Sequence, residues 1–452
     1  MVAVLSCNLF FGQTIPQKLK SATSALLASK PAYSANLSLY VGDEAGNLVY
    51  EFQGDKGLSS ASTQKIFTAA AALETLGSNF QYTTTVSQTG TVSGNTLNGN
   101  LIISSDGDPT LGSWRYDGYK PENFKAKLLT ALKESGIQKI SGDLYIDDSY
   151  FDFQTVPGGW PWNDIGNYYG AGVWGVNWRE NQFDLNMNGK QMNGSNVELP
   201  GVRWINDLKT GGSSDQSLIY TAPFSEVAQI TGTLPAKRMT VSGAMPNPPL
   251  TLGTEIAGWF KDSGITFTGK ILSASMQRIN GEKTEGTEGR KIILEQKSPS
   301  LDKIIYWFMR KSVNFYGETL IRSLGKEKKN EGSFDAGIAY LKDFWQAKGI
   351  NPAMINFADG SGLSPQNYVS ARAEVQALLW SRKQSWFGDF FEGFPTQGNG
   401  MKMKSGTMKN TKSFAGYHTS KDGKKYVFAI IINNYQGADS SEALYKVLNI
   451  LK

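Results

Sequence analysis

Ser62-Thr63-Gln64-Lys65 stands directly before an apolar, alanine-rich run, residues 66–73, and Gly77 follows that run. Alanine and leucine favour helices and glycine commonly ends them, so the stretch predicts a helix that stops at Gly77. Residues three apart lie on one face of a helix, which lets the Lys65 ammonium reach the Ser62 hydroxyl. A lysine desolvated by burial can lose its proton and act as a base at neutral pH. Taken alone, the pattern is far more often that of a capping serine followed by a solvated lysine.

A second short motif, Ser312-Val313-Asn314, follows an aromatic helical stretch at residues 304–309. A serine and an asparagine two apart on a loop can both face a cleft. The serine would serve as a proton relay and the asparagine amide as a hydrogen-bonding partner for a peptide. The bare pattern is too common to carry this interpretation without other motifs.

A third motif, Lys404-Ser405-Gly406-Thr407, precedes a predicted strand and hairpin near the C-terminus. Gly406 would let a substrate backbone approach the strand closely. Lys404 would supply a fixed positive charge, and Ser405 would hydrogen-bond a carboxylate. Found by itself, the motif would be read as a solvated edge strand.

The order and spacing of the three motifs favour the catalytic interpretation. S-x-x-K near the N-terminus, S-x-N about 250 residues later and K-[ST]-G about 90 residues after that form the set shared by penicillin-binding proteins and serine β-lactamases. The wide first gap resembles the class C low-molecular-mass penicillin-binding proteins, the D-alanyl-D-alanine carboxypeptidase/endopeptidase family. Residues 61–65, 107–111, 159–164 and 359–364 resemble stretches of the same family.

The resemblance runs from about Ala35 to the C-terminus and implies an α+β fold with a penicillin-binding/β-lactamase-like transpeptidase domain. It implies that Ser62 attacks the carbonyl of the penultimate D-Ala while Lys65 takes its proton. Ser312 and Lys404 would relay a proton to the departing D-Ala. Water would then cleave the ester, and no metal or organic cofactor is implied.

The same resemblance assigns the substrate-binding groups. The backbone N–H groups of Ser62 and Thr407 would form the oxyanion hole, which typically contributes ~10² to 10³ in rate. Asn314 would orient the substrate amide, and Ser405, next to Gly406, would bind the terminal carboxylate. The family commonly has Asp where this chain has Val313 and Thr where it has Ser405. Neither departure removes a group that the mechanism needs.

Both ends of the chain offer a helix and antiparallel strands, so we expect one catalytic domain built from residues 14–81 and 283–452. Residues 82–282 contain short alternating runs separated by turn residues, which predicts a β-rich insert, in the form of two nested small domains, between the first and second motifs.

Asp164 is the candidate for substrate choice. The stretch 159–164, Gly-Trp-Pro-Trp-Asn-Asp, resembles a family segment that borders the cleft. A carboxylate there could pair with the free amino group of a diaminopimelate side chain. Alternatively, Trp160 and Trp162 are core residues and Asp164 only caps a turn.

Composition narrows the classes of function. The chain has 45 basic and 40 acidic residues, mixed along its length. This balance does not predict the basic surface that nucleic-acid-binding proteins use. With one histidine, His418, and one cysteine, Cys7, it offers no metal site of the His- or Cys-rich kind. Hydrolytic chemistry should therefore use lysine as its base.

The first thirteen residues are apolar and resemble the end of a secretory signal, although no Lys or Arg precedes the run. We therefore expect export to the periplasm or cell envelope. Lipid anchoring at Cys7 is an alternative. No later run approaches the roughly 18 to 20 apolar residues of a membrane helix, so no integral membrane span is expected.

The favoured hypothesis is an exported serine peptidase that cleaves D-Ala-D-Ala ends, and possible crosslinks, of peptidoglycan stem peptides and is acylated by β-lactams. A catalytically silent wall-binding or sensor protein on the same fold is the main rival, but it predicts loss of the nucleophile or a lysine. A β-lactamase is disfavoured by the large insert and by the absence of a recognisable deacylating glutamate motif.

Overall fold

A computed structural model describes residues 13–284 and 289–452. Its central five-stranded sheet, in the order β2-β1-β22-β21-β20, combines both ends of the chain. All its neighbours are antiparallel. The strands are β1 (Asn36–Asp43), β2 (Leu48–Phe52), β20 (Met403–Met408), β21 (Thr411–Thr419) and β22 (Lys425–Asn433). The two ends of the chain meet in this sheet through the pairing of β1 with β22. The predicted signal segment falls almost entirely outside the described residues.

Strand β22 shows why this sheet is buried on both faces. Val427, Ala429 and Ile431 pack into one core cluster. The alternate residues Phe428 and Ile430 pack into another cluster on the opposite face. Because side chains alternate along a strand, a continuous apolar run marks a central strand covered on both sides.

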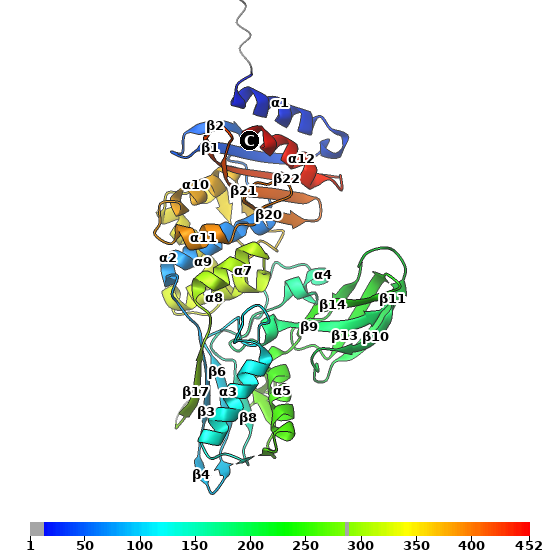
Figure 1. Cartoon of the computed structure of the whole chain (residues 1–452), viewed down its shortest axis with the longest axis vertical. Helices are drawn as coiled ribbons and strands as arrows, with labels where there is room; N and C mark the ends of the chain where they lie inside the picture. Colours follow the sequence, from blue (N-terminus) through cyan, green and yellow to red (C-terminus); the bar gives the residue numbers. More distant parts are fainter. Residues whose placement is uncertain (1–12, 285–288) are drawn as a thin grey trace, which may run out of the picture.

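Helices cover the two faces of the sheet (Figure 1). The terminal helices α1 (Ile15–Leu27) and α12 (Ser440–Leu448) contact each other on one side. On the other side lie α2 (Lys65–Leu76), α7 (Leu301–Arg310), α8 (Asn314–Lys329), α9 (Phe334–Ala347), α10 (Ala371–Ser381) and α11 (Phe387–Glu392). The predicted α+β class is therefore confirmed. In the described part of the chain, no helix combines the length and apolarity needed to cross a membrane.

The segment from β3 to β17, residues 83–297, is called the middle segment. It builds a second sheet, in the order β16-β8-β6-β3-β17. Its strands are β3 (Thr83–Gln88), β6 (Leu101–Ser105), β8 (Leu144–Asp147), β16 (Ile271–Ser273) and β17 (Lys291–Lys297). Strand β17 comes after the predicted boundary at residue 282, yet it pairs with β3. The insert sheet therefore extends past that boundary, because the chain adds a strand before it returns.

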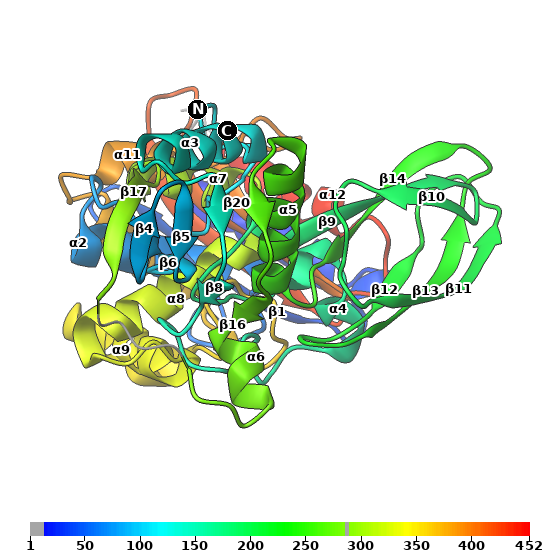
Figure 2. The same ribbon diagram turned by 90° about the horizontal axis from the view of Figure 1, so that it is seen from below.

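A further lobe projects from this segment in both views (Figures 1 and 2). It holds β9 (Gln182–Asn188), β10 (Gln191–Ser195), β11 (Arg203–Thr210), β12 (Leu218–Tyr220), β13 (Val227–Leu234) and β14 (Arg238–Ala244). The middle segment also contains two long helices, α3 (Pro121–Glu134) and α5 (Pro248–Asp262), which the strand-like pattern did not predict.

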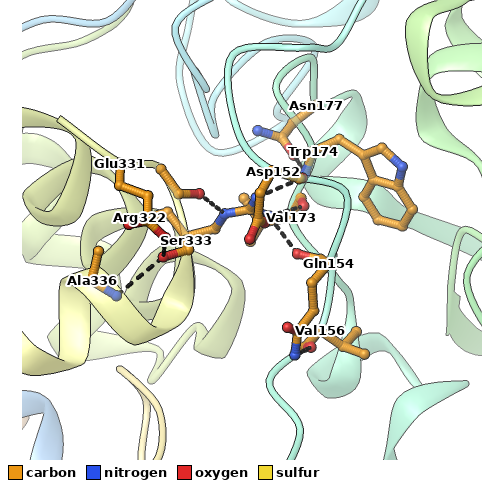
Figure 3. A network of polar contacts seen from close by, with 11 residues as sticks. Asp152, Gln154, Val156, Val173, Trp174, Asn177, Arg322, Glu331, Ser333 and Ala336 are labelled. Atoms are coloured by element: carbon orange, nitrogen blue, oxygen red, sulfur yellow. Dashed lines mark hydrogen bonds and ion pairs between the residues drawn. The ribbon is translucent and has the colours of Figure 1, made fainter. Parts of the chain in front are cut away.

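Arg322 of α8 ties the middle segment to the helical layer. Its side chain is fully buried. It donates hydrogen bonds to the backbone carbonyls of Gln154 and Val173 and forms an ion pair with Asp152 (Figure 3). Removing a charge from water is costly unless its donors are satisfied, and here all five N–H groups find acceptors, the carbonyls of Gly332 and Asp152 included. Residues 152–173 are thus fastened to the helix that begins with Asn314.

Candidate active site

Ser62 lies on a 3₁₀ turn, Ala61–Gln64, that leads directly into α2. Lys65, the first residue of α2, is fully buried. Its Nζ atom lies 2.9 Å from Ser62 Oγ, 2.6 Å from Asn314 Oδ1 and 2.6 Å from the Ser361 carbonyl oxygen. The predicted contact between Ser62 and Lys65 is therefore present.

The acceptors around Lys65 define which way a neutral amine would point. An uncharged lysine has two N–H donors and one lone pair. Asn314 Oδ1 and the Ser361 carbonyl can only accept, so they take the two donors. The lone pair is then left facing Ser62, whose hydroxyl can donate to it. This is the arrangement that proton transfer from Ser62 to Lys65 requires.

Burial also makes the neutral form of Lys65 accessible. Desolvation lowers the pKa of Lys65 to about 7, although Asp359 and Glu318 nearby act in the opposite direction. Glu318 is itself buried, and burial, together with the charge of Asp359, raises its pKa to about 8. Near pH 7 a large fraction of Lys65 can therefore accept a proton.

Lys404 and Ser312 form the second pair. Lys404 on β20 is 1% exposed, and its Nζ atom donates to Ser312 Oγ at 3.0 Å and to the Ser405 carbonyl at 2.8 Å. Burial lowers the pKa of Lys404 well below its usual value, and the charge of Lys65 adds to this effect. Lys404 is therefore enclosed rather than solvated, and its charged form is less favoured than it would be in water.

The loop of the second motif holds Ser312 in an uncommon backbone conformation. Ser312 has a φ of 57°, in the left-handed region that non-glycine residues seldom adopt. Such conformations persist where surrounding contacts impose them, frequently at functional sites. Asn314, two residues on, starts α8 and donates from Nδ2 to the Tyr169 carbonyl at 2.8 Å. Both ends of its amide are thus engaged, one by Lys65 and one by the middle segment.

Gly406 lets strand β20 pack closely against the turn that carries Ser62. A Cβ atom at this position would lie 2.3 Å from the Ser60 carbonyl oxygen, 2.3 Å from Ser413 Oγ and 2.9 Å from the Ser62 nitrogen. Close approach of the nucleophile turn therefore requires a glycine here, and close approach of a substrate backbone to the strand stays a prediction. The third motif lies within edge strand β20 itself and does not precede the strand.

Ser62, Ser312, Asn314 and Thr407 share one cavity of about 700 Å³. Neither Ser405 nor Gly406 is among the residues that line it. The middle segment closes the opposite side with Arg115, Asp164, Tyr168, Tyr169 and Glu180. The cavity therefore lies between the catalytic motifs and the middle segment.

Asp164 belongs to the short helix α4 (Trp162–Ile165), and the Tyr169 hydroxyl donates to it at 3.3 Å. Burial raises the pKa of Asp164, against the opposing effect of this hydrogen bond. Of the two tryptophans beside it, Trp162 is 53% exposed, whereas Trp160 is buried. Trp160 donates from Nε1 to Asp359 Oδ2 at 2.9 Å. Trp160 is therefore a core residue and Trp162 is not.

Several residues of the site were not predicted to act in it. Asp359, Ser361 and Glu318 lie around Lys65, and the stretch 359–364 had been noted only as a resemblance. Its Asp-Gly-Ser-Gly pattern could have indicated a tight turn at a site. No sequence signal links Tyr169 to Asn314, because the contact joins a backbone carbonyl to a side chain 145 residues away.

Comparisons with known proteins show similarity over most of the chain. A model of the D-Ala-D-Ala carboxypeptidase 3 (S13) family matches residues 19–451. The D-alanyl-D-alanine carboxypeptidase DacB of Haemophilus influenzae is 27% identical over 421 residues, covering 87% of this chain and 84% of that protein. A D-alanyl-D-alanine carboxypeptidase of Actinomadura sp. is 25% identical over 456 residues, covering 93% of this chain and 82% of the relative.

A solved structure shows the same fold. The crystal structure of penicillin binding protein 4 from Haemophilus influenzae has a TM-score of 0.79 and 23% identity, covering 96% of this chain and 99% of that one. The same protein complexed with a novel beta-lactam has a TM-score of 0.72. The predicted penicillin-binding type of fold is confirmed.

Proposed function

The chain belongs to the D-Ala-D-Ala carboxypeptidase 3 (S13) family, and from that premise we propose that it cleaves D-Ala-D-Ala through an acyl-enzyme on Ser62. The observation that carries this proposal is the buried Lys65 amine 2.9 Å from Ser62 Oγ. The enzyme is a serine-type peptidase with lysine as its base. The chemistry calls for no metal or organic cofactor.

Acylation begins when Ser62 Oγ attacks the carbonyl carbon of the penultimate D-Ala and passes its proton to Lys65. The C–O bond of the ester forms and the C–N bond of the peptide breaks. The departing amine takes a proton from Ser312 Oγ, and Ser312 regains a proton from the Lys404 ammonium, which lies within hydrogen-bond reach. Water then hydrolyses the ester and restores Ser62.

The developing oxyanion is assigned to the backbone N–H groups of Ser62 and Thr407. The missing side chain at Gly406 supports this assignment, because it lets strand β20 approach the nucleophile turn. Donors fixed before the reaction need no reorganisation as negative charge appears. Ser405 and Thr407 are assigned to the terminal carboxylate, and Asn314 to the orientation of the substrate amide.

The substrates we propose are peptidoglycan stem peptides, with carboxypeptidase action on their ends and endopeptidase action on crosslinks. β-Lactams would acylate the same serine. Asp164 lines the same cavity as Ser62, which supports a contact with a free amino group of the substrate. Export to the periplasm or cell envelope follows from where such a substrate is found.

The retained chemistry argues against a silent wall-binding protein. Burying an amine costs stability. A binding protein would gain nothing from a desolvated lysine beside a serine, whereas a peptidase gains a base. The test is release of D-alanine from a peptide ending in D-Ala-D-Ala. Wild-type protein should release it, and folded Ser62→Ala should not. Equal release by the two proteins would refute the assignment.

A further inference from the structure

We propose that Arg115 binds a carboxylate of the substrate. This carboxylate belongs to a residue of the stem peptide that precedes the scissile D-Ala-D-Ala bond. This inference rests on the proposed function and adds a determinant of substrate choice to it. Arg115 comes from the middle segment and lines the same cavity as Ser62 and Asn314. No catalytic motif includes it.

Glu180 and two tryptophan rings hold the guanidinium of Arg115 in place. Its Nε atom donates to both carboxylate oxygens of Glu180, at 2.9 and 3.0 Å. Its Cζ atom lies 5.3 Å from the ring centroid of Trp114 and 5.6 Å from that of Trp307. The two Nη groups have no protein acceptor in the part of the chain that the structure describes. The side chain is 19% exposed and lines the cavity, so a ligand in the cavity can contact it.

Glu180 is a rigid support for this arginine. It is buried, and it also accepts hydrogen bonds from Ser113 Oγ and Tyr316 Oη, each at 2.6 Å. Residues 179–181 all have φ near 53°, in the left-handed region. A run of three such non-glycine residues costs about 1–2 kcal/mol per residue in a free chain, so the fold imposes this conformation. The direction of the Arg115 fork is thereby fixed.

The position of Arg115 indicates which part of a substrate it meets. Tyr316, which donates to Glu180, lies two residues after Asn314 on α8, and Trp307 lies on α7 just before the Ser312 loop. Arg115 therefore flanks the second motif. The terminal carboxylate of the substrate is assigned to the third motif, on β20. The carboxylate at Arg115 must then belong to a residue that precedes D-Ala-D-Ala.

The chemistry of arginine favours a carboxylate as the ligand. Its planar set of N–H donors matches the two oxygens of a carboxylate. The rings of the neighbouring tryptophans pack beside the guanidinium. Glu180 contacts only Nε, so part of the positive charge stays directed at the cavity. Lys311, which also lines the cavity, adds a second positive charge.

The test uses three peptides that end in D-Ala-D-Ala. The first carries a free carboxylate only on the second residue, the second only on the side chain of the third residue, and the third has carboxamides at both places. Wild-type kcat/KM should be about tenfold higher on at least one acid peptide than on the double amide, the size of one charge-assisted hydrogen bond. The acid peptide that shows the preference identifies the bound residue.

Arg115→Gln should remove this preference and leave the double amide and the rate of penicillin acylation unchanged within twofold. Arg115→Lys, which keeps the charge and loses the fork, should retain part of the preference. The control is Lys409→Gln, which removes one exposed positive charge from the same cavity and should keep the preference.

Equal wild-type activity on all three peptides, or equal losses for Arg115→Gln on all three, would overturn the inference. The first outcome needs no variant, so misfolding cannot obscure it. If penicillin acylation is normal and the acid preference is missing, only the role of Arg115 fails. If neither acylation nor D-alanine release occurs, the proposed function fails as well.

Discussion

Lys65 Nζ lies 2.9 Å from Ser62 Oγ, on a side chain with no exposed surface. The two other acceptors around the amine, Asn314 Oδ1 and the Ser361 carbonyl, come from α8 and from the loop that follows η5 (Pro352–Met354) and β18 (Ile355–Asn356). Three separate parts of the chain therefore hold one amine against one hydroxyl. Burial, which is costly for a charged lysine, is what makes this amine a base.

Replacing each active-site lysine by arginine should separate their tasks. Lys65→Arg should lower the acylation rate by roughly 10² to 10⁴, the usual contribution of a general base, because a guanidinium cannot be deprotonated. Lys404→Arg should lose less, because donation to Ser312 needs only an N–H group. Stopped-flow measurement of penicillin acylation compares the two. Equally mild effects would show that Lys65 is not the base.

The acylation rate should rise with pH through a midpoint near 7. The pKa of Lys65 is lowered to about 7, so the protonated amine dominates below that pH and cannot accept a proton from Ser62. Above it the neutral form dominates and the rate should level off. Rates measured between pH 5.5 and 8.5 test this. A profile that is flat, or that falls as pH rises through 7, contradicts the assignment.

Gly406→Ala should slow acylation strongly, with a smaller effect on the rest of the fold. The new methyl group would lie 2.3 Å from the Ser60 carbonyl oxygen, so β20 and the nucleophile turn must separate. A loss of about 10² or more is expected, the cost of a damaged oxyanion hole. Gly388→Ala is the matched control, because a Cβ there meets no atom within 4 Å. Normal acylation by Gly406→Ala would remove the support for this oxyanion hole.

Asp164→Asn should act on substrate choice alone. An ion pair at a partly exposed carboxylate contributes at most ~1 kcal/mol, so kcat/KM should fall by a factor of up to about five on peptides with a free amino group. Activity on an acetylated analogue and on penicillin should be almost unchanged. A parallel loss on all three substrates would instead assign Asp164 a structural role, through its hydrogen bond with Tyr169.

The parts of the fold with a strong local signal could be predicted. The continuous apolar run of β22 and the alanine-rich run of α2 are properties of short stretches. Helix α3 was missed although Phe124, Leu128 and Leu132 repeat every four residues, because the surrounding glycine and threonine content favoured strands. The insert boundary was placed too early because β17 pairs with a strand about 200 residues before it.

The site residues likewise divide into those that the sequence could predict and those that it could not. Ser62, Lys65, Ser312 and Lys404 belong to motifs whose spacing can be read directly from the sequence. The Arg115–Glu180 pair and the Asn314–Tyr169 contact join residues 65 and 145 positions apart, and neither has a motif of its own. The enclosure of Lys404 likewise depends on packing, so its lowered pKa could not be inferred from the Lys-Ser-Gly pattern.

The central claim is that Ser62 is the nucleophile, and mapping the covalent adduct of a penicillin tests it most directly. Folded wild-type protein incubated with a fluorescent penicillin should gain the mass of one molecule, and digestion should locate it on the peptide that contains Ser62. Ser62→Ala should gain none. An adduct on another serine, or no adduct on folded wild-type protein, would contradict the mechanism.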